Sequence, residues 1–587
     1  MDEQQKRMAE ELLFSEAKQP SFAKALYFGK FDAFQAFPYP KVNQEEYSKT
    51  ETLLNQLNAF ADQHLDPVKI DRQALIPDEL IQGLGKLGIL GLTIPKEYGG
   101  LGMSQYAYCR ATEAIARRCG STALFINAHQ SIGLKALLLF GTEEQKKRWL
   151  PSLAKGEDLA AFSLTEPNAG SDASGIETRA VYDPQKKVYR ITGKKQWITN
   201  GSIAKVLTVM AQTEVDTPQG RQDKVTAFLV TPDMPGFKVT AEALEKVGMR
   251  GSKTANLQFD DLEVPRENIL GPLGGGLKVC LTVLDYGRTT FGATCTGAAK
   301  VLVERAIEHA KTRYQFKRPL ASFALVKKKI AMMSALVFAM DAATYFTAGL
   351  VDAKKGDFML ESAILKVFTS DSLWTILYET MQILGGRSFF TDAPYERMMR
   401  DARLNMIGEG SNEVMRAFIG LVGMRDVGNE LKAIQEALFQ PFSRFSIILG
   451  LGRRVWDRLA APDVPVQSPQ LKEEAKLLSK SVRRFGIAII RLLVRHREDI
   501  IERQLVLDRI ATSAIALYTT TAVLSRLDTD LAKVKGNVDL LGNDLAIGKL
   551  YCNYAMEQVK QNLDTLFWQQ DNLIEKLSDQ ITGMKTR

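Results

Sequence analysis

The chain of 587 residues has few of the side chains that form disulfides or bind metals. It contains five cysteines and four histidines, with no Cys-x-x-Cys pair and no His-Glu-x-x-His motif. An odd number of unpaired cysteines is typical of proteins in a reducing compartment. The composition therefore argues against a disulfide framework, against a bound metal and against histidine-based catalysis.

Long uncharged apolar runs are also lacking. No stretch of about 18 such residues appears, which is the length that a transmembrane helix requires. The first nineteen residues mix acids with bases and resemble neither a signal peptide nor a transit peptide. Hydrophobic residues make up 45% and charged residues 25% of the chain, as in folded globular proteins. We expect a cytoplasmic protein with no membrane-spanning segment.

The pattern of apolar residues divides the chain into five parts. After an N-terminal extension (1–45), helical spacing covers 46–155, and strand-like alternation such as KVYRITGKKQWITNG covers 156–270. Helical spacing returns over 271–425 and again over 430–587, where the proline-containing stretch APDVPVQSPQ predicts a loop. The predicted fold class is α+β and mainly helical.

One glycine motif matches a nucleotide-binding pattern but lacks the flanking strand and helix that such a site requires. Residues 83–88 match Gly-x-Gly-x-x-Gly, but a dinucleotide fingerprint needs a strand before it and a helix that starts on it. The preceding PDELIQGL has helical spacing instead. We therefore expect these glycines to belong to a helix and its exit turn.

Two segments near the centre carry residues suited to binding a flat cofactor. Residues 162–172 (FSLTEPNAGSD) predict an irregular loop whose N–H groups and hydroxyls, including Thr165 and Ser171, can bind heteroatoms or a phosphate. An ordinary turn explains the same letters equally well. Further on, Trp197 can lie against a ring system beside the Thr199 hydroxyl. Taken alone, a tryptophan in the core is the more common arrangement.

Glu409 stands between Gly408 and Gly410, just before a helix start with Ser411 as N-cap. Glycines on both sides allow a substrate to approach the carboxylate closely. A surface acid that caps a helix is, for this segment alone, the favoured alternative.

Taken together, in order and spacing, these segments resemble the acyl-CoA dehydrogenases over residues 20–425. The resemblance is strongest to the very-long-chain branch, with an additional C-terminal region. The matching segments are SFAKALYFGKFDAFQAFPYP, INAHQSIGLKALLLFGT, FSLTEPNAGSD, WITNGS, GMRGSKTANLQFDDLEVPRENILG, LDYGR, RYQF, QILGG and GEGSNEVMR.

The resemblance implies an N-terminal helical domain, a central β-barrel-like domain and a C-terminal four-helix bundle, followed by the additional helical domain. It also implies a homodimer or higher homo-oligomer in which FAD lies between the β-domain, the bundle and a neighbouring subunit. The residues that it assigns to FAD are Phe162, Leu164, Thr165, Ser171, Trp197, Ile198, Thr199, Arg313, Phe316, Gln382, Gly385, Gly386, Ser411 and Glu413. Those that it assigns to the acyl-CoA are Ser171, Asp285, Arg288 and Gly410.

The implied reaction is FAD-dependent dehydrogenation of a long-chain acyl-CoA to trans-2-enoyl-CoA, the first step of fatty acid β-oxidation. Glu409 would take the α-proton while a hydride passes from the β-carbon to flavin N5, and electrons would then leave to an electron-transfer flavoprotein. Burial beside the acyl chain would raise the pKa of Glu409 and make it a stronger base. The alternatives are an acyl-CoA oxidase that uses oxygen, and an assembly or scaffold protein in which catalysis is secondary.

Three positions depart from the family pattern. Gly408 replaces an aromatic residue, Ser388 replaces the last glycine of GGxGF, and Glu413 stands where Asp or Gln is usual. None of them removes an essential group, and we expect them to affect specificity more than activity.

The C-terminal region carries most of the net charge. Residues 431–587 hold 23 Lys+Arg and 18 Asp+Glu, so this region contributes +5 to the net charge of +8. Residues 476–497 contain seven basic residues and no acid, and their apolar side chains share one helical face. Such a helix can lie on an anionic membrane, as the C-terminal extension of the very-long-chain relatives does, or pack with a solvated basic face. Without an aromatic-studded basic groove, we expect no nucleic-acid binding.

Overall fold

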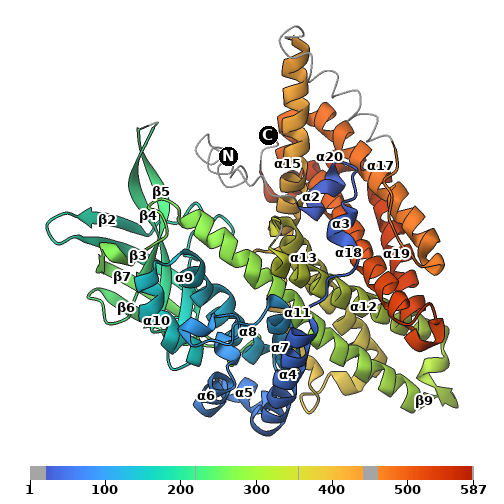
Figure 1. Ribbon diagram of the computed structural model, residues 1–587, viewed down its shortest axis with the longest axis horizontal. Coiled ribbons are helices and arrows are strands. Elements are labelled where there is room, and N and C mark those ends of the chain that lie inside the picture. Colours follow the sequence, from blue (N-terminus) through green and yellow to red (C-terminus); the bar gives the residue numbers. More distant parts are fainter. Residues whose placement is uncertain (1–20, 219, 355, 440–459, 585–587) are drawn as a thin grey trace. The chain divides into compact units, whose positions relative to one another are not determined.

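The computed structural model describes residues 21–218, 220–354, 356–439 and 460–584 (Figure 1). Its residues form two compact units. The first contains residues 41–411, and the second contains residues 21–40 together with the described residues from Asn412 onward. Helices dominate both units, and a curled sheet lies in the first. The predicted mainly helical α+β class is confirmed.

The first unit begins with a helical part. Its helices are α4 (Gln44–His64), α5 (Pro67–Gln73), α6 (Asp78–Lys86), α7 (Gln105–Ala116), α8 (Gly120–Asn127), a π-helical turn (Ala128–Gly133), α9 (Leu134–Phe140) and α10 (Glu143–Lys155). The side chains of Asn43, Asp66, Ser104 and Thr142 cap four of these starts by accepting backbone N–H groups. Gly83 and Gly85 lie inside α6, which confirms the helical interpretation of the glycine motif.

The sheet follows as the central part of the first unit. Its strands are β1 (Ala160–Ser163), β2 (Arg179–Asp183), β3 (Val188–Thr199), β4 (Val206–Thr217), β5 (Gly220–Val230), β6 (Phe237–Ala241), β7 (Thr254–Pro265) and β8 (Ile269–Leu270). The order is β6-β7-β3-β2-β4-β5-β8, and β1 pairs parallel with β4. The register of β3 against β7 shifts between Lys195 and Ile198, so β3 is bulged there.

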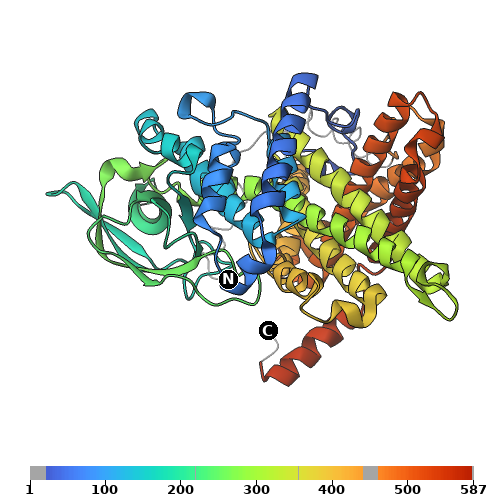
Figure 2. The ribbon, with the colours of Figure 1, turned by 90° about the horizontal axis from the view of Figure 1, so that it is seen from below.

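Long helices complete the first unit. They are α11 (Gly276–Thr312), α12 (Ala324–Ala353), α13 (Met359–Leu384) and the shorter α14 (Tyr395–Leu404). In Figure 2 the long helices, coloured green to olive, run side by side. α11 has 37 residues and is therefore about 55 Å long. It starts against β5 and ends at the hairpin of β9 (Tyr314–Gln315) and β10 (Arg318–Pro319), far from the sheet (Figure 1).

The second unit contains helices and no strand over its described residues. It comprises α2 (Phe22–Tyr27), α3 (Ala33–Ala36), α15 (Asn412–Phe439), α17 (Lys472–His496), α18 (Gln504–Lys533), α19 (Asp544–Asp564) and α20 (Gln570–Thr582). The predicted loop precedes α17, since residues 461–468 are neither helix nor strand.

The limits of the second unit differ from the predicted boundaries. α15 runs without a break through 425–430, and α2 from the N-terminal extension packs against it. Tyr27 donates to the Ile419 carbonyl at 2.7 Å, and its ring fills the space that a Cβ on Gly423 would occupy. This close approach unites two segments that are distant in the sequence.

The basic helix predicted within 476–497 is α17. Leu478, Val482, Phe485, Ile489 and Leu492 on its apolar face are fully buried. α2, α18 and α19 of the same unit pack against α17. The basic side chains at 476, 480, 483, 484, 491, 495 and 497 are exposed. The structure therefore matches the packed helix with a solvated basic face.

Three helical segments are long and apolar enough to cross a membrane, contrary to the sequence-based expectation. They are Gly120–Phe140, α12 and α18, and 72%, 67% and 89% of their most apolar windows are buried. Their apolar side chains are thus mostly used for packing inside the protein.

Candidate active site

Glu409 lies in a tight turn that follows α14 and contains two residues with left-handed backbone. Its φ is +58°, and that of Gly410 is +95°. Although the residue keeps some exposed surface, its Oε2 atom is buried and has no hydrogen-bond partner in the described part of the chain. A Cβ on Gly287 of α11 would lie 2.7 Å from this oxygen. Glycine at 287 therefore makes room for the carboxylate.

Burial raises the pKa of Glu409 to about 7, and the positive charges of Arg288 and Lys366 oppose that shift. Near neutral pH the carboxyl can both hold and release a proton. The favoured alternative for this segment, a surface acid that caps a helix, is wrong because the carboxylate oxygen points into the interior.

Two buried cations contact the carbonyls of this turn. Lys366 Nζ of α13 donates to the Gly410 carbonyl at 2.6 Å. Arg288 Nε of α11 donates to the Glu409 carbonyl at 3.4 Å, a long bond. Arg288 is also paired with Asp285 at 3.0 Å, and Ser362 Oγ of α13 donates to the same carboxylate at 3.1 Å.

Asp285 and Arg288 are only 7% and 3% exposed. They lie beneath the turn of Glu409, and burial raises the pKa of Asp285 to about 7 while Arg288 opposes the shift. Their predicted contact with the CoA portion stays a prediction. In the structure Arg288 contacts the Glu409 carbonyl, and Asp285 contacts Arg288.

The loop after β1 is anchored by a buried ion pair. Lys195 Nζ of β3 lies 2.6 Å from Glu166 Oε1 and also donates to the Leu164 carbonyl at 2.9 Å. The Glu166 carboxylate accepts the backbone N–H of Thr178 at 3.1 Å. Burial lowers the pKa of Lys195 to about 8; for Glu166, burial is outweighed mainly by Lys195, so its pKa falls. Both groups are charged at pH 7 and fix the loop against the sheet.

This anchoring leaves the predicted cofactor side of the loop open. Ser171 is exposed and Thr165 half-buried, whereas Phe162 is 8% exposed. The Thr165 carbonyl accepts the Gln196 N–H at 2.9 Å, which ties the loop to the bulge of β3.

Trp197 occupies that bulge and is 63% exposed, with φ at +60°. Its backbone N–H donates to Oδ1 of the Asn256 side chain at 3.3 Å. The core-tryptophan interpretation is therefore wrong, because the bulge turns the indole outward. Ile198 is instead buried in the sheet core, and Thr199 is half-buried and pairs with Thr254.

An apolar cluster connects the loop to the base. Phe162 belongs to it together with Cys280 and Val283 of α11, and Leu164 and Ile132 pack against it. Ile132 also approaches Gly287, where a Cβ would lie 3.0 Å from its Cγ2 atom. An apolar wall therefore borders both the exposed hydroxyls of the loop and the Glu409 carboxylate.

Other predicted FAD residues lie at the distant end of α11. Arg313 is its C-cap, and Phe316 of the hairpin is 87% exposed. Gln382, Gly385 and Gly386 end α13 and are exposed. Because α11 is about 55 Å long, the hairpin residues cannot reach a ligand held at the sheet of the same chain. Ser411 follows the base turn, and Glu413 is an exposed residue in the first turn of α15.

Sequence reasoning did not identify Lys366, Glu166 or Lys195. A lysine within the apolar run SAILKVFT was the available signal for Lys366. The composition argued against histidine-based catalysis, and His129 is a buried structural residue. Burial lowers its pKa to about 4, and its Nδ1 accepts the Ala160 N–H at 3.0 Å.

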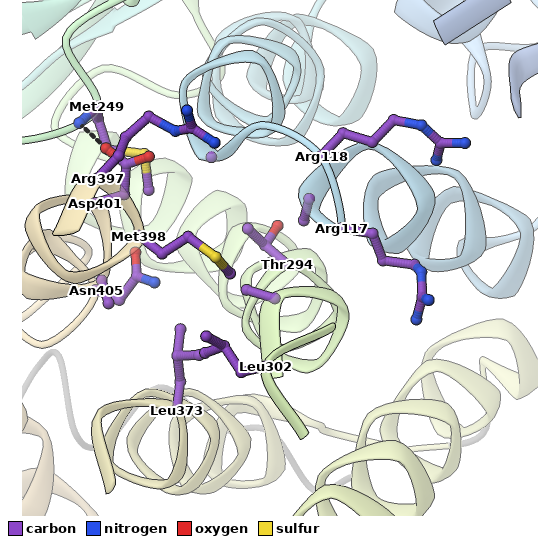
Figure 3. Close-up of a pocket in the computed structure, with 14 residues that line it drawn as sticks. Arg117, Arg118, Met249, Thr294, Leu302, Leu373, Arg397, Met398, Asp401 and Asn405 are labelled. Carbon is purple, nitrogen blue, oxygen red and sulfur yellow. Dashed lines mark hydrogen bonds between the residues drawn. The ribbon is translucent and has the colours of Figure 1, made fainter. Parts of the chain in front are cut away.

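A small cavity of about 30 Å³ lies beside α14 (Figure 3). Its lining residues include Thr294 and Leu302 of α11, Leu373 of α13 and Asn405, the C-cap of α14. It holds roughly one or two water molecules and is too small for an acyl chain. None of its lining residues belongs to the predicted site.

The residues on this face fit a flavin. An outward tryptophan, exposed hydroxyls and an adjoining apolar wall suit a flat, partly polar ring system. The uncompensated Oε2 of Glu409 is suited to accepting a proton from a carbon acid bound beside that wall.

Comparison with known families gives four matches along the chain. Models of the acyl-CoA dehydrogenase N-terminal, middle and C-terminal domains match residues 48–157, 161–262 and 274–423. The model described as the ACAD9/ACADV C-terminal domain matches residues 469–586.

Individual relatives give the same result. A mitochondrial very long-chain specific acyl-CoA dehydrogenase of Macaca fascicularis is 37% identical over 88% of this chain and 80% of its own length. The crystal structure of an acyl-CoA dehydrogenase complexed with FAD from Bacillus anthracis has a TM-score of 0.77 at 28% identity, covering 92% of this chain and 91% of that one. The butyryl-CoA dehydrogenase of Megasphaera elsdenii has a TM-score of 0.61 at 34% identity, covering 66% of this chain and 99% of that one.

Proposed function

The chain belongs to the acyl-CoA dehydrogenase family, and on that premise we propose that Glu409 is the base that removes the α-proton of a long-chain acyl-CoA. The observation that carries the proposal is the buried Oε2 of Glu409, which has no hydrogen-bond partner in the described residues. An unpaired buried carboxylate is a costly arrangement, and it is justified where the oxygen must accept a proton.

The environment of Glu409 gives it the strength that this reaction requires. The α-hydrogens of a thioester are weakly acidic, so a base with its pKa near the working pH is the most effective. Burial raises the pKa of Glu409 to about 7, while Arg288 and Lys366 keep it from rising further. With its pKa close to neutral pH, the carboxyl can lose a proton and take one up again.

FAD is the cofactor of this family, and when bound it accepts the hydride that leaves the β-carbon. We expect the chain's own contribution to come from Trp197 beside the ring system and from the hydroxyls of Thr165 and Ser171. The Glu166–Lys195 pair holds this loop in place. The apolar wall around Ile132 excludes water from the carboxylate, which strengthens the electrostatic interactions there.

The preference for long acyl chains is supported by the very-long-chain relatives. We propose an electron-transfer flavoprotein as the electron acceptor; release of peroxide in air would instead indicate an oxidase. We also propose a homodimer or higher homo-oligomer, because Arg313 and Phe316 lie too far from the sheet to serve the same chain's flavin. A cytoplasmic location remains part of the proposal.

The test is the substitution Glu409→Gln. We expect a folded, yellow protein whose flavin is no longer bleached by long-chain acyl-CoA under anaerobic conditions, because the amide cannot take the α-proton. A matched control is Glu308→Gln, which changes an exposed acid on α11 and should leave bleaching unchanged. Normal bleaching by Glu409→Gln would refute the assignment of the base.

A further inference from the structure

We propose that Lys366 is a positioning residue for the base: together with Ser362 on the same face of α13, it holds the Glu409–Gly410 turn in its reactive geometry. The inference rests on the proposed role of Glu409. Lys366 Nζ donates to the Gly410 carbonyl at 2.6 Å, and the lysine is fully buried.

The turn needs such support because its backbone is strained. Glu409 has a left-handed φ of +58°, which side chains with a Cβ rarely adopt, and Gly410 follows at +95°. A residue in this region persists only where the surrounding structure holds it. Release of the turn would let Glu409 relax and move its carboxylate away from Gly287.

α13 supports both carbonyls of the turn through residues one helical turn apart. Lys366 contacts the Gly410 carbonyl directly. Ser362, four residues earlier and therefore on the same face, donates to Asp285, which pairs with Arg288. Arg288 then reaches the Glu409 carbonyl at 3.4 Å, the longer of the two contacts. Lys366 thus makes the shorter and direct bond.

The charge of Lys366 also acts on the base. Burial lowers the pKa of Lys366 to about 8, and the Glu409 carboxyl opposes this shift, so the ammonium remains mostly charged at pH 7. Cys295 and Arg288 of α11 and Asp371 of α13 also face it. Glu409 in turn faces Arg288, Lys366 and the Tyr108 ring of α7. Removal of the lysine charge should therefore raise the pKa of Glu409.

The experiment uses the full-length FAD-loaded protein with Lys366→Met, Lys366→Arg and Ser362→Ala. The control Lys329→Met removes a lysine of α12 that pairs with Glu379. Glu379 lies 13 residues after Lys366 in α13 and is therefore about 20 Å away from it. Two rates are measured between pH 5.5 and 9. One is flavin bleaching by saturating long-chain acyl-CoA, and the other is exchange of α-protons into D₂O from a 3-thiaacyl-CoA, which has no β-hydrogen to lose.

For Lys366→Met we expect both rates to fall about 10–100-fold even at the alkaline plateau, since a misplacement of about 1 Å can cost that much. The acidic limb of the pH–rate profile should also move to higher pH. Substrate affinity should stay within about threefold of the wild type, because the turn positions the base and not the substrate. In Lys366→Arg the acidic limb of the pH–rate profile should stay at the wild-type pH, and most of the wild-type rate at the alkaline plateau should be recovered. In Ser362→Ala both rates should fall about threefold. In Lys329→Met both rates should match those of the wild type.

A wild-type plateau for Lys366→Met, with or without a shifted limb, would overturn the positioning role. Should Lys366→Met fail to retain FAD, Ser362→Ala decides, and an unchanged exchange rate in that variant would overturn the proposal. Failure of the wild type itself to exchange α-protons would instead refute the role of Glu409, and this inference with it.

Discussion

Buried ionisable side chains at the site are accommodated in two different ways. The Oε2 atom of Glu409 is buried without a hydrogen-bond partner among the described residues, and the pKa of the carboxyl is raised to about 7. The Glu166–Lys195 pair shows the opposite solution, in which burial is compensated by a close counter-charge and backbone donors. The first arrangement serves reactivity, and the second serves a fixed geometry.

The raised pKa of Glu409 makes the effect of Glu409→Gln on stability depend on pH. Because the folded pKa lies above the ordinary value of 4.5, the folded state binds this proton more tightly. The stabilisation is complete below about pH 4.5 and is lost as the pH rises through 7. The variant should therefore gain up to about 3 kcal/mol relative to the wild type between pH 5 and pH 8. Urea unfolding of both proteins at the two pH values measures this, and a constant difference would contradict the raised pKa.

At the scale of elements, α11 depends on glycines for close approach. Gly287 leaves space for the Glu409 carboxylate, and a Cβ on Gly297 would lie only 2.4 Å from the Glu113 carbonyl of α7. Two helices that cross at such a distance cannot accept a larger side chain without moving apart. The same helix carries Arg288 and Asp285, so its position determines the geometry of the base.

We predict that Gly297→Ala destabilises the protein although alanine favours helix. The intrinsic gain is about 1 kcal/mol, and the clash with a backbone oxygen should exceed it, for a net loss of about 1–3 kcal/mol. Gly428→Ala in α15 is the matched control, because only Leu493 Cδ2 lies near, at 3.9 Å. That variant should gain about 0.5–1 kcal/mol. Thermal unfolding of both compares the two effects, and stabilisation by Gly297→Ala would show that α7 and α11 tolerate the added methyl group.

At the scale of the whole molecule, the chain forms two units that meet in sequence directly after the base turn, at Ser411 and Asn412. The second unit carries α17, whose apolar face is buried and whose basic face is exposed. Its attraction to a membrane would therefore come mainly from charge, since Val494 and Leu477 are the large apolar side chains that α17 exposes.

We predict that α17 contributes only salt-sensitive binding to anionic vesicles. The exposed charges Lys480, Arg483 and Arg491 are replaced together by glutamine, and sedimentation is compared with the wild type. At low salt the variant should bind more weakly, by about 1 kcal/mol for each charge. At about 1 M salt the difference should vanish, because the Debye length falls to about 3 Å. A difference that persists there would mean that apolar side chains of α17 leave the core.

Motifs along the chain were sufficient to predict the general fold, and they point to Glu409 as the proposed base. The alternation over 156–270 and the helical spacing elsewhere predicted the helical and β parts, since periodicity reflects which face is buried. Glu409 was identified from its glycine neighbours within a family-like order of segments. For Trp197, the residues alone favoured the core, because a bulge that turns the indole outward leaves no clear trace in local sequence.

By itself the sequence determined the family and the order of the helical and β parts, and it predicted Glu409 as the base, because these depend on local patterns. Only the tertiary structure decided that Lys366 donates to the Gly410 carbonyl beside Glu409, that Lys195 anchors the loop, and that α2 joins the second unit. The tertiary structure also showed that the apolar face of the basic helix α17 packs inside the protein. An amphipathic pattern is the same for a membrane and for a protein core, and only packing shows which one covers the apolar face.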